Sequence, residues 1–148
     1  MDVIEPESDL VAIGYWQSEG EPDLPQPHQF VGPALPEDLR RKLSVYLSSG
    51  VEFMAFMGHS HCRFGCGIPN RSMGCRDLTD GTWVWPEGLV HYLDVHGVVL
   101  PARFVEHAAR SAWQIRDVSL PSMREGADGS SRIPISYDFW KTFRAVHG

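Results

Sequence analysis

The 148-residue chain has only three cysteines, and its apolar runs, such as that over 53–57, are only a few residues long. A membrane-spanning helix needs about 20 apolar residues, so none is predicted. Three cysteines cannot all pair within one chain, which favours reduced thiols or metal ligands over disulfides. The first residues are acidic where a secretory signal would carry Lys or Arg. We therefore expect a soluble cytoplasmic protein that does not bind membranes.

Lys and Arg are missing from residues 1–38, which hold nine of the 19 acidic residues. The net charge of −6 therefore arises in the amino-terminal segment. A net-acidic surface repels phosphate backbones, and no stripe of basic and aromatic residues is present, so no nucleic-acid partner is expected. The acidic segment favours two interpretations, a solvated arm that improves solubility or a segment that steers a basic protein surface toward the chain.

Signatures of catalytic sites are also missing. The sequence has no His-Glu-x-x-His, no Gly-x-x-x-x-Gly-Lys, no Gly-x-Ser-x-Gly and no dinucleotide-binding glycine pattern. Asp77, Asp80, Glu87 and His91 cluster near an expected hairpin and helix start, where a carboxylate and a histidine could act as a general base and its orienter. Asp80 and Glu87 are also the residue types that a turn and a helix start require. A non-catalytic protein is thus expected.

Length and composition predict a single α+β domain over residues 1–148. Residues 1–34 are acidic and rich in proline, which predicts an extended arm, anchored on the core by an edge strand within 10–16. A buried strand is expected at 51–57. Asp80-Gly81 lies between two short runs of β-type residues and predicts a hairpin near 75–85 within a small antiparallel sheet.

Four helices are predicted from apolar residues at helical spacing, most of them opened by proline. They are expected at 36–49, 86–96, 101–113 and 136–147. Gly97 suits the left-handed residue that ends the second of them. Residues 117–135 are rich in Gly, Ser and Pro, which predicts a long loop.

Cysteine and histidine concentrate within residues 58–67, where Cys62 and Cys66 are separated by Arg-Phe-Gly. Zn²⁺ prefers thiolate and imidazole ligands, and glycine beside a cysteine lets backbone amides turn toward the sulfur. The order of a two-cysteine turn, a hairpin and a helix with His91 and His96 resembles treble-clef and related zinc modules. The resemblance covers residues 58–96 and implies a structural zinc held by Cys62, Cys66, His91 and His96.

Other arrangements of these residues stay open. His91 and His96 are separated by about 140° around an ideal helix, so they are expected to share a metal only if the last turn tightens or unwinds. Cys75, at the base of the expected hairpin, is an alternative ligand. Without metal, the cysteines would be small buried thiols beside hydrogen-bonded histidines.

Tryptophan is abundant, with five residues in the chain. Trp16, Trp83 and Trp85 are candidate anchors for a partner because tryptophan is enriched at interface hot spots, and core packing is the alternative. Trp83 and Trp85 share one face of a strand, and Pro86 favours an edge position. We therefore expect a small acidic interaction domain, partner-binding or inhibitor-like, with a structural zinc. A zinc-dependent or carboxylate/His hydrolase-like enzyme that uses the Cys62–His96 region is the alternative.

Overall fold

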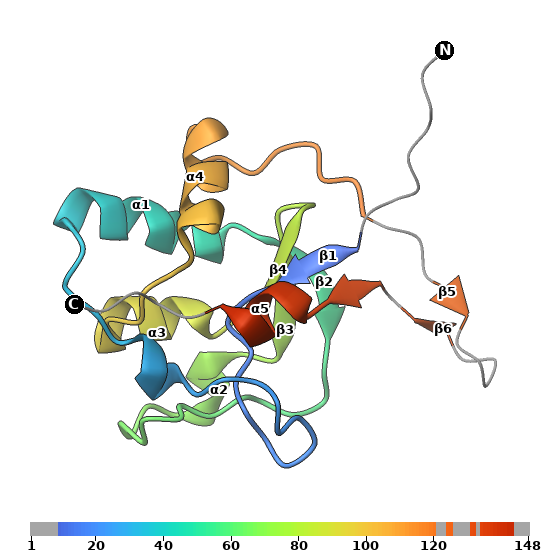
Figure 1. Cartoon of the computed structure of the whole chain (residues 1–148), viewed down its shortest axis with the longest axis horizontal. Helices are drawn as coiled ribbons and strands as arrows, with labels where there is room; N and C mark the ends of the chain where they lie inside the picture. Colours follow the sequence, from blue (N-terminus) through green and yellow to red (C-terminus); the bar gives the residue numbers. More distant parts are fainter. Residues whose placement is uncertain (1–8, 121–123, 126–130, 133, 144–148) are drawn as a thin grey trace.

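A computed structural model of the chain describes residues 9–120, 124–125, 131–132 and 134–143, and it combines helices with a five-stranded sheet (Figure 1). In chain order the elements are β1 (Leu10–Ala12), the 3-10 helix η1 (Pro27–Phe30), α1 (Glu37–Ser48), β2 (Val51–Ala55), α2 (Asn70–Met73), β3 (Arg76–Thr79), β4 (Trp83–Pro86), α3 (Leu89–His96), α4 (Ala102–Arg110), β5 (Arg124–Glu125), β6 (Ser131–Arg132), β7 (Ile135–Ser136) and α5 (Asp138–Thr142). The expected α+β class is confirmed. No helix among the described residues is long and apolar enough to cross a membrane.

The main sheet has the strand order β2-β3-β4-β1-β7 and is mixed. Strands β2, β3 and β4 pair antiparallel, whereas β1 lies parallel to both β4 and β7. The prediction of an antiparallel sheet was wrong because β1 and β4 are joined by a long connection that contains α1, which lets the two strands run the same way. Both β1 and β4 were expected at an edge of the sheet, but both are interior strands. Pro86 is tolerated because it occupies the last position of β4.

The predicted hairpin is present. Strands β3 and β4 pair with Leu78 opposite Trp85, and Gly81 in the turn has φ +96°. The Asp80 carboxylate accepts hydrogen bonds from the backbone N–H groups of Thr82 (2.9 Å) and Trp83 (2.7 Å). Asp80 therefore closes the turn, as an Asp at this position commonly does.

A helix lies within each of the four predicted ranges, and each is shorter than expected. Helix α3 begins at Leu89 and not at 86, because Pro86 belongs to β4. Helix α4 ends at Arg110, since the backbone turns to positive φ at Ala112. Helix α5 covers Asp138–Thr142 of the predicted 136–147, of which residues 144–147 lie outside the described part. Helices η1 and α2 were not predicted.

The two Pro- and Gly-rich segments contain more regular structure than expected. Strands β5 and β6 pair within the predicted loop 117–135, of which 121–123, 126–130 and 133 lie outside the described residues. Within the expected arm 1–34, residues 1–8 are likewise not described, and residues 9–34 include β1 and η1. Apolar side chains of this segment, including Ile13 and Phe30, are fully buried in the core.

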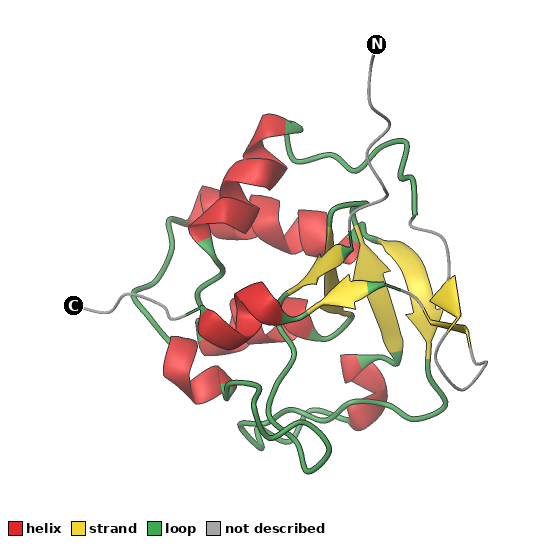
Figure 2. Ribbon diagram, turned by 45° about the vertical axis from the view of Figure 1, so that its right-hand side comes forward, coloured by secondary structure: helices red, strands yellow, loops and turns green. Residues whose placement is uncertain are grey.

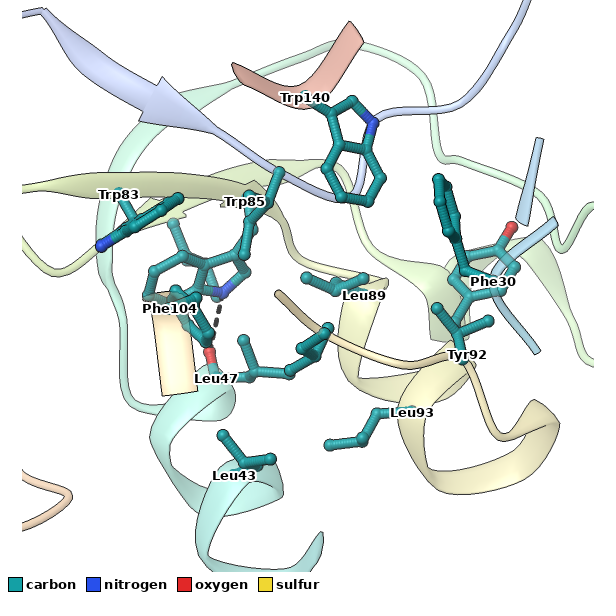
Figure 3. Close-up of a cluster of buried hydrophobic side chains, with 14 of the residues drawn as sticks. Phe30, Leu43, Leu47, Trp83, Trp85, Leu89, Tyr92, Leu93, Phe104 and Trp140 are labelled. Carbon is teal, nitrogen blue, oxygen red and sulfur yellow. Dashed lines mark hydrogen bonds between the residues drawn. The ribbon is translucent and has the colours of Figure 1, made fainter. Parts of the chain in front are cut away.

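The main core lies between the sheet and the helices that gather on one side of it (Figures 2 and 3). Trp83 and Trp85 both pack edge-on against Phe104 of α4, so the two indoles share a face as predicted. The Trp85 indole N–H donates to the Leu47 carbonyl at 3.1 Å (Figure 3). Trp16, Trp83 and Trp85 are 7%, 4% and 0% exposed, which fits the core alternative and leaves no accessible surface for a partner anchor.

Candidate metal centre

Four side chains from two distant segments converge beside helix α3. The ligand atoms of Cys62, Cys66, His91 and His96 all lie within 4.8 Å of one another. Cys62 Sγ is 3.3 Å from His96 Nε2, and Cys66 Sγ is 3.4 Å from His91 Nε2. The two Nε2 atoms are 3.2 Å apart. The structure thus brings together all four residues of the predicted ligand set.

Three of the six donor–donor spacings are close to the edges of a zinc tetrahedron. Zn–S bonds of about 2.3 Å and Zn–N bonds of about 2.05 Å in tetrahedral geometry place sulfur and nitrogen about 3.5 Å apart, and two nitrogens about 3.3 Å apart. The observed S···N contacts of 3.3 and 3.4 Å and the N···N contact of 3.2 Å fall within about 0.2 Å of these values. The four side chains could together hold a metal ion.

The turn that carries the cysteines depends on glycine. The Gly65 N–H donates to the Cys62 carbonyl at 3.1 Å, and Gly65 has φ +63°. A Cβ at Gly65 would meet no atom within 4 Å, so the backbone angle and not crowding favours glycine here. The tight turn lets Cys66 return toward α3 beside Cys62, although three residues separate them.

The two histidines come from the first and last turns of α3, which ends at the left-handed residue Gly97 (φ +67°) as predicted. The last turn was expected to tighten or unwind for the histidines to meet; it does not unwind, because α3 stays helical through His96. Each Nε2 lies at the far end of its side chain, and the rings cross at 77° with their centroids 4.9 Å apart. Ring length and orientation therefore compensate for the angular separation along the helix.

Neighbouring side chains hold both the turn and the rings in place. The Tyr92 hydroxyl accepts from the Arg63 N–H at 2.9 Å and donates to the His61 carbonyl at 3.3 Å. Phe64 stacks on His96 with 4.3 Å between centroids and 12° between planes. Contacts of this kind orient metal ligands before the metal arrives.

The protonation of the histidines suits metal binding. Burial lowers the pKa of both His91 and His96, with a further lowering of the His91 pKa by the nearby His96 and of the His96 pKa by His28. Neutral imidazole is the form that coordinates a metal. The site is thereby prepared for a cation at neutral pH.

The remaining sequence candidates lie elsewhere. Cys75 is not part of the cluster, so the structure does not support it as an alternative ligand. Asp80 accepts a 2.6 Å hydrogen bond from the Tyr46 hydroxyl, and Glu87 accepts backbone N–H bonds from Cys75 and Arg76. Both carboxylates thus have structural partners and do not join His91 in a catalytic pair.

Comparisons with protein families, curated proteins and solved structures find no match for this chain. The functional argument therefore rests on the residues themselves. Sequence reasoning treated Asp77 only as one member of a carboxylate cluster and missed its individual environment, described below. An acidic residue within a predicted strand could have indicated a buried carboxylate at Asp77.

Proposed function

We propose that the protein is a non-catalytic, zinc-stabilised interaction domain in which Cys62, Cys66, His91 and His96 bind one structural Zn²⁺. The complete set of four donors carries this proposal, since catalytic zinc sites have three protein ligands and keep one position for water or substrate. Two thiolates would balance the charge of the ion, which lowers the free-energy cost of holding it in a partly buried site. The bound metal would join the loop at 62–66 to helix α3.

Metal content and geometry test the zinc site directly. Protein purified without chelator should contain one zinc per chain by elemental analysis, and Co²⁺ substitution should give the intense visible absorption of a tetrahedral site with sulfur ligands. Cys62→Ser and Cys66→Ser should each lower zinc affinity strongly, because each removes one thiolate. Cys75→Ser is the matched control and should keep one zinc per chain. Full zinc content in both Cys62→Ser and Cys66→Ser would refute this ligand set.

A structural role and the hydrolase-like alternative differ in the coordination of the metal. An enzyme needs an open position, so azide or a hydroxamate would enter the coordination sphere of Co²⁺ and change its spectrum. A closed Cys₂His₂ site predicts an unchanged spectrum at millimolar azide. A clear spectral change, together with hydrolysis of an ester substrate that is lost in His91→Ala, would favour the enzyme.

The interaction role is supported by charge and by exposed apolar side chains. The chain carries a net charge of −6, and Phe56 and Met57, directly after edge strand β2, are exposed to solvent. We propose a basic protein surface as the partner, with charge setting the rate of encounter and these apolar side chains slowing dissociation. With an oligolysine peptide as probe, added salt should reduce the association rate, whereas Met57→Ser should raise the dissociation rate. Binding that responds to neither change would refute this partner class.

A further inference from the structure

Asp77 on strand β3 is a buried carboxylate without a cationic partner. Its side chain is only 6% exposed, and it lies on the opposite face of the strand from the core residue Leu78. No Lys, Arg or His in the described part of the chain forms an ion pair with it. Because a buried charge lowers stability unless it is paired, an unpaired buried carboxylate suggests a ligand-binding role.

The nearest cation is already engaged elsewhere. Arg76 precedes Asp77 in the chain, but its guanidinium pairs with Glu87 at 2.7 Å and lies 3.6 Å from Glu52. Arg76 borders the same pocket as Asp77, but its ion pairs with Glu87 and Glu52 engage its guanidinium. Two acidic groups therefore hold the cation next to Asp77 and leave the Asp77 carboxylate uncompensated.

Asp77 lines an open pocket of about 480 Å³ with aromatic walls. Tyr15 and Tyr137 meet edge to face there, with 5.5 Å between ring centroids, and Phe56 lies at the same pocket. The buried Tyr15 hydroxyl interacts with the Asp77 carboxylate, although the two groups do not meet in ideal hydrogen-bond geometry. Burial together with the Asp77 charge raises the Tyr15 pKa well above its usual value, so this hydroxyl stays neutral. In this pocket, which we call the Asp77 pocket, the carboxylate and the hydroxyl thus lie together without an ion-paired cation among the described residues.

We propose that the Asp77 pocket binds an alkylammonium group, the side chain of a lysine carried by the protein partner. An ammonium has three N–H donors, which suit the Asp77 carboxylate and the Tyr15 hydroxyl oxygen. Aromatic faces attract a desolvated cation, and Tyr15, Tyr137 and Phe56 supply them. Binding would neutralise the buried charge, and the Tyr15 hydroxyl oxygen could accept a hydrogen bond from the ammonium. The Asp77 pocket shares no lining residue with the four metal-ligand candidates, and only the assignment to a partner protein rests on the proposed function.

Small probes separate the cation from the rest of the partner. Zinc-loaded full-length protein is titrated with n-butylammonium, with Nα-acetyl-lysine methylamide and with the corresponding Nε-acetylated, neutral compound, and binding is followed by NMR shifts and calorimetry. Both cations should bind, and the neutral compound should not. Asp77→Asn should weaken cation binding at least about tenfold, the loss expected when a charge-assisted hydrogen bond is removed. Asp117→Asn, at an exposed loop carboxylate, should bind like the wild type.

A second variant and a peptide ligand test the proposal independently of Asp77→Asn. Tyr15→Phe keeps the ring and removes only the hydroxyl, so weaker amine binding is expected even if Asp77→Asn does not fold. A lysine-containing pentapeptide should bind tighter than n-butylammonium if the ligand is carried by a protein. Equal binding of the two, tighter binding of the arginine analogue, or wild-type affinity in both Asp77→Asn and Tyr15→Phe would overturn the assignment. Zinc content is measured in parallel, so failure here is distinguishable from failure of the zinc proposal.

Discussion

Replacing Asp77 by Asn should stabilise the fold at neutral pH. Burial raises the pKa of Asp77 from 3.8 to about 6, while the Tyr15 hydroxyl opposes this only in part. A folded-state pKa about two units above the unfolded value means that ionised Asp77 costs about 3 kcal/mol of stability once both states are deprotonated. Asn has nearly the same shape and no charge, so Asp77→Asn should recover up to that amount at pH 7.5.

The pH dependence has a definite sign. Between about pH 4 and pH 6 the folded state binds more protons at Asp77 than the unfolded state, so this group lowers stability as pH rises. The advantage of Asp77→Asn should therefore be below about 1 kcal/mol at pH 4 and should grow to its full value above pH 7. The other titratable groups at the pocket are Tyr15, His59, Cys75, Arg76 and Tyr137, and burial raises the pKa of Tyr137 to about 12.

Urea unfolding of the wild type and of Asp77→Asn at pH 4, 5, 6 and 7.5 measures the difference in their unfolding free energies. Acid also releases zinc from its ligands, but this affects both proteins alike, so only the difference in unfolding free energy is interpreted. An Asp77→Asn protein that is less stable than the wild type at pH 7.5 would refute the reasoning. A difference that does not change with pH would do the same, because it would show that Asp77 is compensated in the folded state.

Further expectations concern the hairpin, the core and the zinc site. Gly81→Val should cost about 1–3 kcal/mol in thermal or urea unfolding because Gly81 has positive φ, and Gly81→Asn should cost less. Trp85→Phe should lower the unfolding free energy by about 1–3 kcal/mol, since it removes the indole N–H that donates to the Leu47 carbonyl together with part of a fully buried ring. Phe64→Ala should weaken zinc affinity in a competition assay by loosening His96, while zinc stoichiometry at saturation stays at one. Removing zinc with a chelator should lower the midpoint of thermal unfolding, and it should also weaken n-butylammonium binding at the Asp77 pocket.

The cluster of Cys62, Cys66, His91 and His96 could be predicted because it depends on residue types that are visible in the sequence. Cys62 and Cys66 are a close thiol pair, and few side chains other than His91 and His96 could complete a soft site on a neighbouring helix. The hairpin could also be predicted, because Asp80-Gly81 is a local signal that depends on four residues and not on the rest of the fold. Both predictions rest on short-range chemistry.

The position of β1 could not be predicted for the opposite reason. Val11 pairs with Trp83, more than seventy positions along the chain, and nothing near Val11 indicates a parallel partner. The same strand insertion places Trp83 and Trp85 in the middle of the sheet and buries them, which the adjacent Pro86 had argued against. Long-range pairing thus decided which aromatic residues are buried, and with them which surface is left for a partner.

The loop between β2 and α2 belongs to both proposed sites, and this gives the zinc a role beyond stability. Its first part contributes His59 and Ser60 to the wall of the Asp77 pocket, and the Ser60 N–H donates to the Gly74 carbonyl at 3.0 Å. Its next residues carry Cys62 and Cys66, which the metal would tie to α3. The loop has no helix or strand of its own before α2, so few backbone hydrogen bonds fix its course. A metal at its centre would supply the missing constraint and shape the pocket wall that a lysine must enter.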